Sequence, residues 1–298
     1  MTMDQEPPLA WVQAYGKNIQ SQHGEDGIID ELFKRIGNAN KWCVEFGALN
    51  GTHHSNSWHA VMEEGYSGVL IEADPTYFEK LQQVYKDTPR AYCMNEFVEF
   101  EGSKRLDALL ARTPIPKDFD LLSIDIDGND YHVWDSLTEY RPRAVLIEFN
   151  PTIPNDISFV QPRDMSVQQG SSLLALQELG KAKGYRLAAV VGVNGFFVLE
   201  ELFSKLGLAP ATLDEMYPDT MYHTRLFQLY DGTLVLDGYQ ELLWRHQPLR
   251  QEDVQALPAH KRKYLSGVSS GGFMRTFKYY ARKFPLYSAV QRVRKNMK

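Results

Sequence analysis

Short apolar segments alternate with amphipathic segments through the first two thirds of this chain, and this alternation limits the folds open to it. The apolar segments have little internal alternation of polar and apolar residues, which is typical of parallel strands that helices cover on both faces. We predict these strands at 41–46, 68–73, 90–94, 120–126 and 144–149. Helices are predicted at 25–36, 56–64, 75–85, 103–111 and 130–140. This order predicts a mostly parallel sheet with right-handed crossovers.

The end of the alternating region has a different pattern. A predicted helix at 171–183 is followed by two strands, 185–191 and 195–199, which Gly192–Val193–Asn194 joins. A tight turn of this kind predicts an antiparallel hairpin at the edge of the sheet. Five βα units followed by such a hairpin form the Rossmann-like, seven-stranded layout of class I methyltransferases. A dinucleotide-binding dehydrogenase would continue with parallel strands instead.

Length and composition are those of an ordinary globular protein. With 298 residues, 43% of them apolar and 23% charged, the chain can form one sizeable α/β domain with an appendage, or two small domains. No apolar run approaches the roughly 20 residues of a membrane-spanning helix, and the N-terminus lacks the pattern of a secretory signal. We therefore expect a soluble, cytoplasmic protein in which Cys43 and Cys93 are buried free thiols.

The first predicted strand leads into a loop suited to a cofactor. Glu45 lies near the strand end, Gly47 permits close approach of the backbone to a ligand, and Gly51 permits a tight exit. The glycine spacing G-x-x-x-G differs from the G-x-G-x-x-G of a pyrophosphate site, so a cofactor with an amino-acid moiety suits this loop better, with Glu45 facing its ammonium or sulfonium end. Glu72, which ends the next strand, is placed to accept both ribose hydroxyls of an adenosine. Taken alone, the loop is interpreted equally well as a cofactor site or as a chance turn. The acid Glu72 at the end of the next strand favours the cofactor site.

Four ordered segments carry a resemblance to a known family. They are SQHGED (21–26), VEFGALNGTHHSNS (44–57), GYSGVLIEADP (65–75) and LLSIDIDGNDYHVW (121–134). Together they resemble the FkbM-like methyltransferases over residues 20–200. The resemblance implies transfer of a methyl group from S-adenosylmethionine, usually to a hydroxyl of a sugar or secondary metabolite.

The resemblance also implies a set of residues that bind S-adenosylmethionine. They are Gln22, Glu45, Gly47, Gly51, Ser55, Asn56, Glu72 and Asp125. The chain departs from the family pattern after the fourth strand, where D-x-E-G-x-E is usual and DIDGND (125–130) stands here. Shorter acids at two positions alter the geometry of the site and leave its use of a metal open.

Acidic side chains gather after the fourth and fifth predicted strands. Asp125, Asp127 and Asp130 follow one strand and Glu148 ends its neighbour, so all should meet at the carboxyl edge of the sheet. We assign Asp125, Asp127 and Glu148 as catalytic candidates, because a carboxylate can take the proton that a hydroxyl acceptor loses. Alternatively, Asp125, Asp127 and Asp130 hold Mg²⁺ or another divalent cation that polarises the acceptor. A third interpretation makes Asp130 an acid that complements the dipole of the next helix and Asp127 a turn residue.

The rest of the chain is expected to form an extension. We predict a methyltransferase domain at 21–205, an irregular lead-in at 1–20 and a C-terminal extension at 206–298. Within the extension, 206–253 are predicted to form helices with a strand at Thr233–Leu236. This part is interpreted either as a cover for the acceptor site or as a contact in a homo-oligomer.

The end of the chain is strongly basic. Asp253 is the last acidic residue and 11 Lys or Arg residues follow it, whereas residues 1–253 carry a net charge of −17. Within 273–298, apolar and basic residues fall on opposite sides of predicted helices. Three interpretations stay open: docking on the acidic body or a second subunit, peripheral contact with an anionic membrane surface, and nucleic-acid binding, which no recognisable nucleic-acid module supports.

The sequence therefore predicts an S-adenosylmethionine-dependent O-methyltransferase that acts on a hydroxyl of a sugar, glycan or secondary metabolite. A nucleotide-binding oxidoreductase is a weaker alternative, because it would need the pyrophosphate glycine pattern that the chain lacks. A binding or scaffold protein that kept the fold and lost catalysis is the other alternative. The retained Glu45, Gly47 and Glu72 argue against loss of the cofactor.

Overall fold

The computed structural model describes residues 5–218 and 220–264 of the chain. These residues belong to two compact units, the first ending at His223 and the second beginning at Thr224. The first unit holds one large sheet, and the second holds two small ones. The functional division at residues 20 and 205 stays a prediction.

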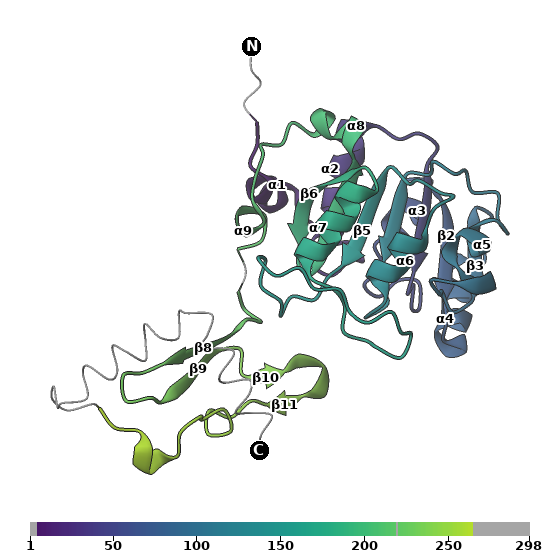
Figure 1. Cartoon of the computed structure of the whole chain (residues 1–298). Helices are drawn as coiled ribbons and strands as arrows, with labels where there is room; N and C mark the ends of the chain where they lie inside the picture. The colour runs from purple at the N-terminus through teal and green to yellow at the C-terminus, as the bar shows by residue number, and fades with distance from the viewer. Residues whose placement is uncertain (1–4, 219, 265–298) are drawn as a thin grey trace. The chain divides into compact units, whose positions relative to one another are not determined.

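A seven-stranded sheet forms the centre of the first unit (Figure 1). Its strands lie in the order β3-β2-β1-β4-β5-β7-β6, where β7 is antiparallel to both of its neighbours and all other pairs are parallel. This confirms the predicted mostly parallel sheet with an antiparallel final hairpin. The strands are β1 (Trp42–Phe46), β2 (Ser67–Glu72), β3 (Ala91–Asn95), β4 (Leu121–Ile124), β5 (Ala144–Glu148), β6 (Tyr185–Val191) and β7 (Asn194–Leu199).

Helices cover both faces of this sheet, because its central strands are apolar on both sides. Apolar residues of α5, α6 and α7 pack on one face, and those of α1, α2, α3 and α4 pack on the other; Figure 1 shows α6 and α7 lying across the strands. The helices are α1 (Pro8–Tyr15), α2 (Glu25–Ile36), α3 (Trp58–Met62), α4 (Pro75–Tyr85), α5 (Leu106–Leu110), α6 (Asp130–Ser136), α7 (Leu173–Ala182), α8 (Glu200–Phe203) and α9 (Leu213–Met216). Single 3₁₀ turns lie at η1 (Gly102–Lys104) and η2 (Ser204–Leu206).

The lead-in at 1–20 was predicted to be irregular. This prediction is wrong in part, because α1 occupies Pro8–Tyr15. Proline is favoured at the first position of a helix, where its missing N–H has no intrahelical partner to lose. Trp11 of α1 is fully buried, and the guanidinium of Arg35 from α2 lies 5.5 Å from its ring. Pro8 thus stands at the first position of a helix within a segment that was predicted to be irregular.

The helices predicted within 206–253 are confirmed at α9, and from residue 224 onward they are corrected by the second unit. Its described residues form the hairpin of β8 (Thr224–Gln228) and β9 (Leu234–Gly238) and the pair β10 (Glu241–Leu242) and β11 (Gln247–Pro248). The strand predicted at Thr233–Leu236 falls on β9. Asp231–Gly232 makes the turn between β8 and β9, with Gly232 at φ +88°, and this Asp-Gly pair is the hairpin signal that the sequence interpretation missed. The basic segment at 273–298 lies outside the described residues.

Two expectations from composition can be compared with the structure. Cys43 and Cys93 are both free thiols, as predicted, but only Cys43 is buried, whereas Cys93 is half-buried. Burial raises the pKa of both thiols. In the part of the chain that the structure describes, no helix combines the length and the apolar character needed to cross a membrane.

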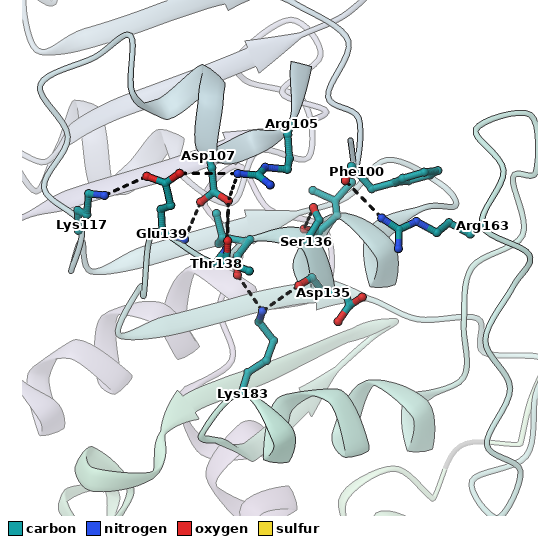
Figure 2. A network of polar contacts seen from close by, with 12 residues as sticks. Phe100, Arg105, Asp107, Lys117, Asp135, Ser136, Thr138, Glu139, Arg163 and Lys183 are labelled. Atoms are coloured by element: carbon teal, nitrogen blue, oxygen red, sulfur yellow. Dashed lines mark hydrogen bonds and ion pairs between the residues drawn. The ribbon is translucent and has the colours of Figure 1, made fainter. Parts of the chain in front are cut away.

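A polar network fixes the end of α6 that lies away from the cavity described below (Figure 2). The buried carboxylate of Asp107 accepts hydrogen bonds from the N–H and hydroxyl of Thr138 and from the N–H of Glu139, at 3.0–3.3 Å. The ammonium of Lys183 donates to the backbone oxygens of Asp135 and Leu137. These contacts tie α5 and the C-terminal end of α7 to Asp135 in the last turn of α6 and to residues 137–139, which follow that helix.

We predict that Asp107→Ala lowers the free energy of unfolding by about 2–4 kcal/mol, because several hydrogen bonds to one buried charged group are lost. Glu139→Ala is the matched control, since Glu139 forms only exposed ion pairs with its side chain, to Lys117 and Arg105. Such pairs contribute about 0–1 kcal/mol. Urea unfolding measures the free energy of unfolding of both variants. Equal losses of this free energy would show that the hydrogen bonds of Asp107 do not stabilise the fold more than exposed ion pairs do.

Candidate functional site

A cavity of about 370 Å³ lies where the carboxyl ends of the parallel strands meet. Ligands of open α/β sheets bind at this edge, and the volume is in the range of small-molecule sites. The predicted site residues that line it are Gln22, Glu45, Gly47, Glu72, Asp125, Asp127 and Glu148. Gly51, Ser55, Asn56 and Asp130 are not among the lining residues.

Glu45, next to the last residue of β1, is buried and is bound by its own loop. One oxygen of its carboxylate accepts from the N–H of Asn56 at 2.7 Å, and the other accepts from the hydroxyls of Ser55 and Ser57 at 2.7 and 2.6 Å. Burial raises the pKa of Glu45, and these hydrogen bonds oppose the rise. Ser55 and Asn56 therefore hold Glu45 from behind the cavity wall, while the contact of Glu45 with a cofactor stays a prediction.

Gly47 lets the end of β1 touch the end of β4. It lies at φ +77°, and a Cβ at this position would overlap the backbone oxygen of Asp125. Gly51 has a similar backbone conformation, but a Cβ there would lie 2.9 Å from the ring of Tyr85 on α4. The first glycine is thus needed at the cavity, and the second is needed for packing of the loop against a helix.

Glu72, at the end of β2, fixes the neighbouring loop and faces the cavity. Its two oxygens accept from the N–H groups of Leu49 and Asp74, each at 2.7 Å. A carboxylate has about four acceptor positions, so capacity remains for two hydroxyl donors. This arrangement suits the predicted binding of a ribose diol.

The SQHGED segment shapes one wall through its two acids. Asp26 accepts from three consecutive N–H groups, those of residues 19–21, at 2.7–2.9 Å. Glu25 accepts from the N–H of Gln22 at 3.2 Å and from the side-chain amide of Asn194 at 3.0 Å. Glu25 also accepts from the N–H of His23 at 2.6 Å. Of its three partners, Gln22 and Asn194 line the cavity. The sequence analysis placed Glu25 and Asp26 at the start of a predicted helix and did not predict that they anchor the preceding segment.

A second group of carboxylates lies at the ends of β4 and β5. Asp125, Asp127 and Glu148 each offer an oxygen within 4.8 Å of the others. Burial, together with the neighbouring acids, raises the pKa of both Asp125 and Glu148. Asp127 is exposed and adopts φ +54°, a conformation that costs energy for a residue other than glycine. We call these three residues the acidic cluster.

Asp130, a predicted metal ligand, has a different place. It is buried, and its two oxygens accept from the N–H groups of Ile126 and Gly128 at 3.0 and 2.9 Å. Asp130 thus closes the turn that precedes α6, because its side chain points back toward residues 126–128. The structure brings Glu148, and not Asp130, to Asp125 and Asp127.

Phe97, Met165 and Gln168 are among the lining residues that were not predicted. Phe97 follows β3 at the same edge of the sheet, and Met165 and Gln168 come from the long segment between β5 and α7. The signal for Phe97 was its position just after a strand end, where an aromatic ring can stack on a flat ligand. The other two lie far from any strand, so no sequence pattern placed them.

The charge of the cavity is one-sided. Six carboxylic side chains line it, and His54 is its remaining ionisable lining group; no Lys or Arg lies among the described residues that line it. Burial and the neighbouring His53 and His23 lower the pKa of His54, which favours its uncharged form. The cavity therefore attracts cations and hydrogen-bond donors and repels phosphates.

The strand order and the antiparallel β7 define a Rossmann-like α/β sheet of the methyltransferase type. No family model matches the chain, and no curated protein matches it. It is similar to the solved N-terminal domain of EvdMO1 with SAH bound, at 9% identity over 60% of this chain and 80% of that one, with a TM-score of 0.38. A putative O-methyltransferase from Klebsiella pneumoniae is 17% identical over 65% of this chain and 90% of that one, with a TM-score of 0.42.

We predict that Gly47→Ala destabilises the protein much more than Gly65→Ala. Gly65 has nearly the same φ, +76°, but no atom lies within 4 Å of the position of its Cβ. Gly65→Ala should lower the free energy of unfolding by about 1–2 kcal/mol from backbone strain alone. Gly47→Ala should add about 1–3 kcal/mol for the displaced end of β4. Urea unfolding measures both, and equal values would contradict a tight contact between Gly47 and Asp125.

Proposed function

We propose that this protein is an S-adenosylmethionine-dependent methyltransferase of the FkbM-like type, which methylates a hydroxyl of a sugar, glycan or secondary metabolite. The observation that carries the proposal is the acidic cavity without Lys or Arg among its described lining residues. S-adenosylmethionine bears a sulfonium and an ammonium against a single carboxylate, so such a cavity attracts it. The pyrophosphate of a dinucleotide would be repelled by the same carboxylates.

The lining residues suit the parts of this cofactor. Glu72 offers acceptors to the ribose hydroxyls, and Phe97 offers an aromatic surface to the adenine. Gln22, held by Glu25, offers an amide to the amino-acid end, and Gly47 allows close approach of the backbone. When bound, the cofactor supplies an electrophilic methyl group attached to a positively charged sulfur.

The acidic cluster lies where the acceptor has to lose a proton. The acceptor oxygen gains the methyl group as its O–H bond breaks, the methyl–sulfur bond breaks with its electron pair staying on sulfur, and the proton passes to a carboxylate. Asp127 is exposed to solvent, whereas Asp125 and Glu148 are partly buried and lie close to each other. These three groups are the proposed bases, and holding the acceptor oxygen in line with the methyl group supplies much of the rate.

A divalent cation is the second form of this proposal. Asp125, Asp127 and Glu148 present three hard oxygen ligands close enough to share one ion, as Mg²⁺ prefers. A cation there would stabilise the acceptor alkoxide and would offset the repulsion among the three carboxylates. The ligand set that we propose contains Glu148 in place of the predicted Asp130, which its backbone hydrogen bonds already engage.

Location and partners are also proposals. The cytoplasmic location, a homo-oligomer and peripheral membrane contact through 273–298 rest on sequence alone, and nucleic acid is not expected as a partner. A binding protein that kept the fold without catalysis is the remaining alternative. The cavity with its acidic cluster favours an enzyme, because three partly satisfied carboxylates are costly unless a reaction or ion uses them.

We predict that calorimetric titration of the cofactor-stripped protein shows micromolar binding of S-adenosylhomocysteine and no binding of NAD⁺. The reason is that no Lys or Arg, which a pyrophosphate would need, lies among the described residues that line the cavity. Binding of NAD⁺ alone would overturn the cofactor assignment, and binding of neither would favour the scaffold alternative. A subsequent acceptor screen with Mg²⁺ or EDTA distinguishes the cation from the carboxylate base.

We further predict that Glu72→Ala weakens the affinity for S-adenosylhomocysteine by about 10- to 150-fold, or about 1.5–3 kcal/mol, as expected for lost hydrogen bonds to a charged group. Glu79→Ala, on the exposed side of α4, is the control and should leave affinity unchanged. Urea unfolding shows whether each variant is folded at the temperature of the titration. A folded Glu72→Ala protein with wild-type affinity would remove Glu72 from the cofactor site.

A further inference from the structure

The segment between β5 and α7 lacks helix and strand over residues 149–172, yet parts of it are buried. Gln161 is only 1% exposed, and Asn150 and Ser171 are buried as well. A long segment of this kind is typically functional or disordered. Burial of its polar side chains excludes disorder here and directs attention to what the segment holds in place.

Gln161 closes residues 161–170 into a compact loop. Its side-chain oxygen accepts from the N–H groups of Gly170 and Gln169 at 2.8 and 3.3 Å, and its side-chain nitrogen donates to the backbone oxygen of Val167 at 3.1 Å. Its own backbone oxygen lies 2.9 Å from Nε2 of His132 on α6. One buried amide thus fixes the path of the loop and ties it to α6.

Two more contacts attach the loop to the cavity edge. The side-chain amide of Asn129, in the turn that carries Asp127, donates to the backbone oxygens of Asp164 and Val167 at 3.1 and 3.2 Å. The guanidinium of Arg163 lies 4.7 Å from the ring of Phe100 and donates to the backbone oxygen of the same residue (Figure 2). The loop therefore spans from the segment after β3 to the turn after β4.

Of the described residues of this loop, only Met165 and Gln168 line the cavity. Both are uncharged, and they share the cavity with Asp125, Asp127 and Glu148. Within the described residues, the side chain of Gln168 makes no hydrogen bond, so its donor and acceptor are available to a ligand.

We propose that residues 161–170 form the acceptor-side wall of the cavity, that Met165 and Gln168 determine which acceptors enter, and that Gln161 is the residue that positions them. An uncharged wall facing an acidic cluster admits neutral or cationic acceptors and repels carboxylates and phosphates. The assignment of this wall to the acceptor rests on the proposed function. The positioning of the wall by Gln161 rests only on the hydrogen bonds described above.

The test replaces Gln168 by Cys and compares two disulfide reagents, neutral 2,2′-dithiodipyridine and anionic 5,5′-dithiobis(2-nitrobenzoate). Ser166→Cys is the control: it lies at an exposed position of the same loop, outside the cavity and beside the single carboxylate of Asp164. The quantity compared is the rate of labelling by the anionic reagent divided by the rate of labelling by the neutral one. We expect this ratio to be about tenfold lower at position 168 than at position 166. The ratio of the two reagents cancels differences in thiol ionisation between the sites.

Adding Gln161→Met tests the positioning role, because it keeps side-chain length and removes the amide. We expect the discrimination at position 168 to fall to the level at 166, and hydrogen exchange of the Gln169 and Gly170 amides to accelerate at least about tenfold. Gln161→Glu keeps the acceptor for both amides and should restore part of their protection. Affinity for S-adenosylhomocysteine should stay within about twofold of the value for the parent protein.

The outcomes separate the two proposals. Equal reagent ratios at 166 and 168 would overturn the selective wall, and unchanged exchange in Gln161→Met would overturn the positioning role. A parent protein that binds no S-adenosylhomocysteine would instead overturn the proposed function, while the labelling and exchange results still decide the placement of the wall.

Discussion

Hydrogen bonds from backbone N–H groups to buried carboxylates hold the edge of the sheet on which the cavity depends. Glu72 and Asp130 each accept from two N–H groups of the turn or loop that follows a strand, and Asp26 accepts from three. A buried carboxylate is costly unless it is hydrogen-bonded, so each loop has to fold around its acid. Because N–H groups and not Lys or Arg satisfy these acids, the described cavity wall stays negative.

The hydrogen-bond partners of the acids separate those that shape loops from those that are candidates for chemistry. Asp130 has both oxygens engaged by the backbone and contributes to the shape of a turn. Asp125 and Glu148 instead meet each other, and Asp127 lies beside them in a strained conformation. Like charges so close are unfavourable unless a proton, a cation or a donor lies between them. The acidic cluster is thus the part of the edge whose energy a ligand can lower, which is a physical reason to place chemistry there.

The sequence was sufficient for the sheet and insufficient for parts of the site. Apolar strands and helical periodicity predicted the core of the fold, because burial on both faces of a sheet leaves a direct pattern in the chain. Because the carboxyl ends of parallel strands converge at one edge of a sheet, the sequence also predicted correctly that Glu72 and Glu148 lie at the cavity. It could not tell that Asp130 points into its own turn, since that depends on side-chain direction over three residues. Met165 and Gln168 were out of reach because a loop without periodicity carries no signal of its path.

The charge of the cavity also bears on turnover in the proposed reaction. Methyl transfer removes the positive charge from sulfur, so the carboxylates around the cavity attract the product S-adenosylhomocysteine less than the substrate. The proton that the acceptor loses passes to the acidic cluster, which further lowers the negative charge near the product. Both changes weaken binding after transfer and not before it. An acidic cavity bounded by the uncharged residues Met165 and Gln168 therefore favours entry of a cationic cofactor and exit of a neutral one.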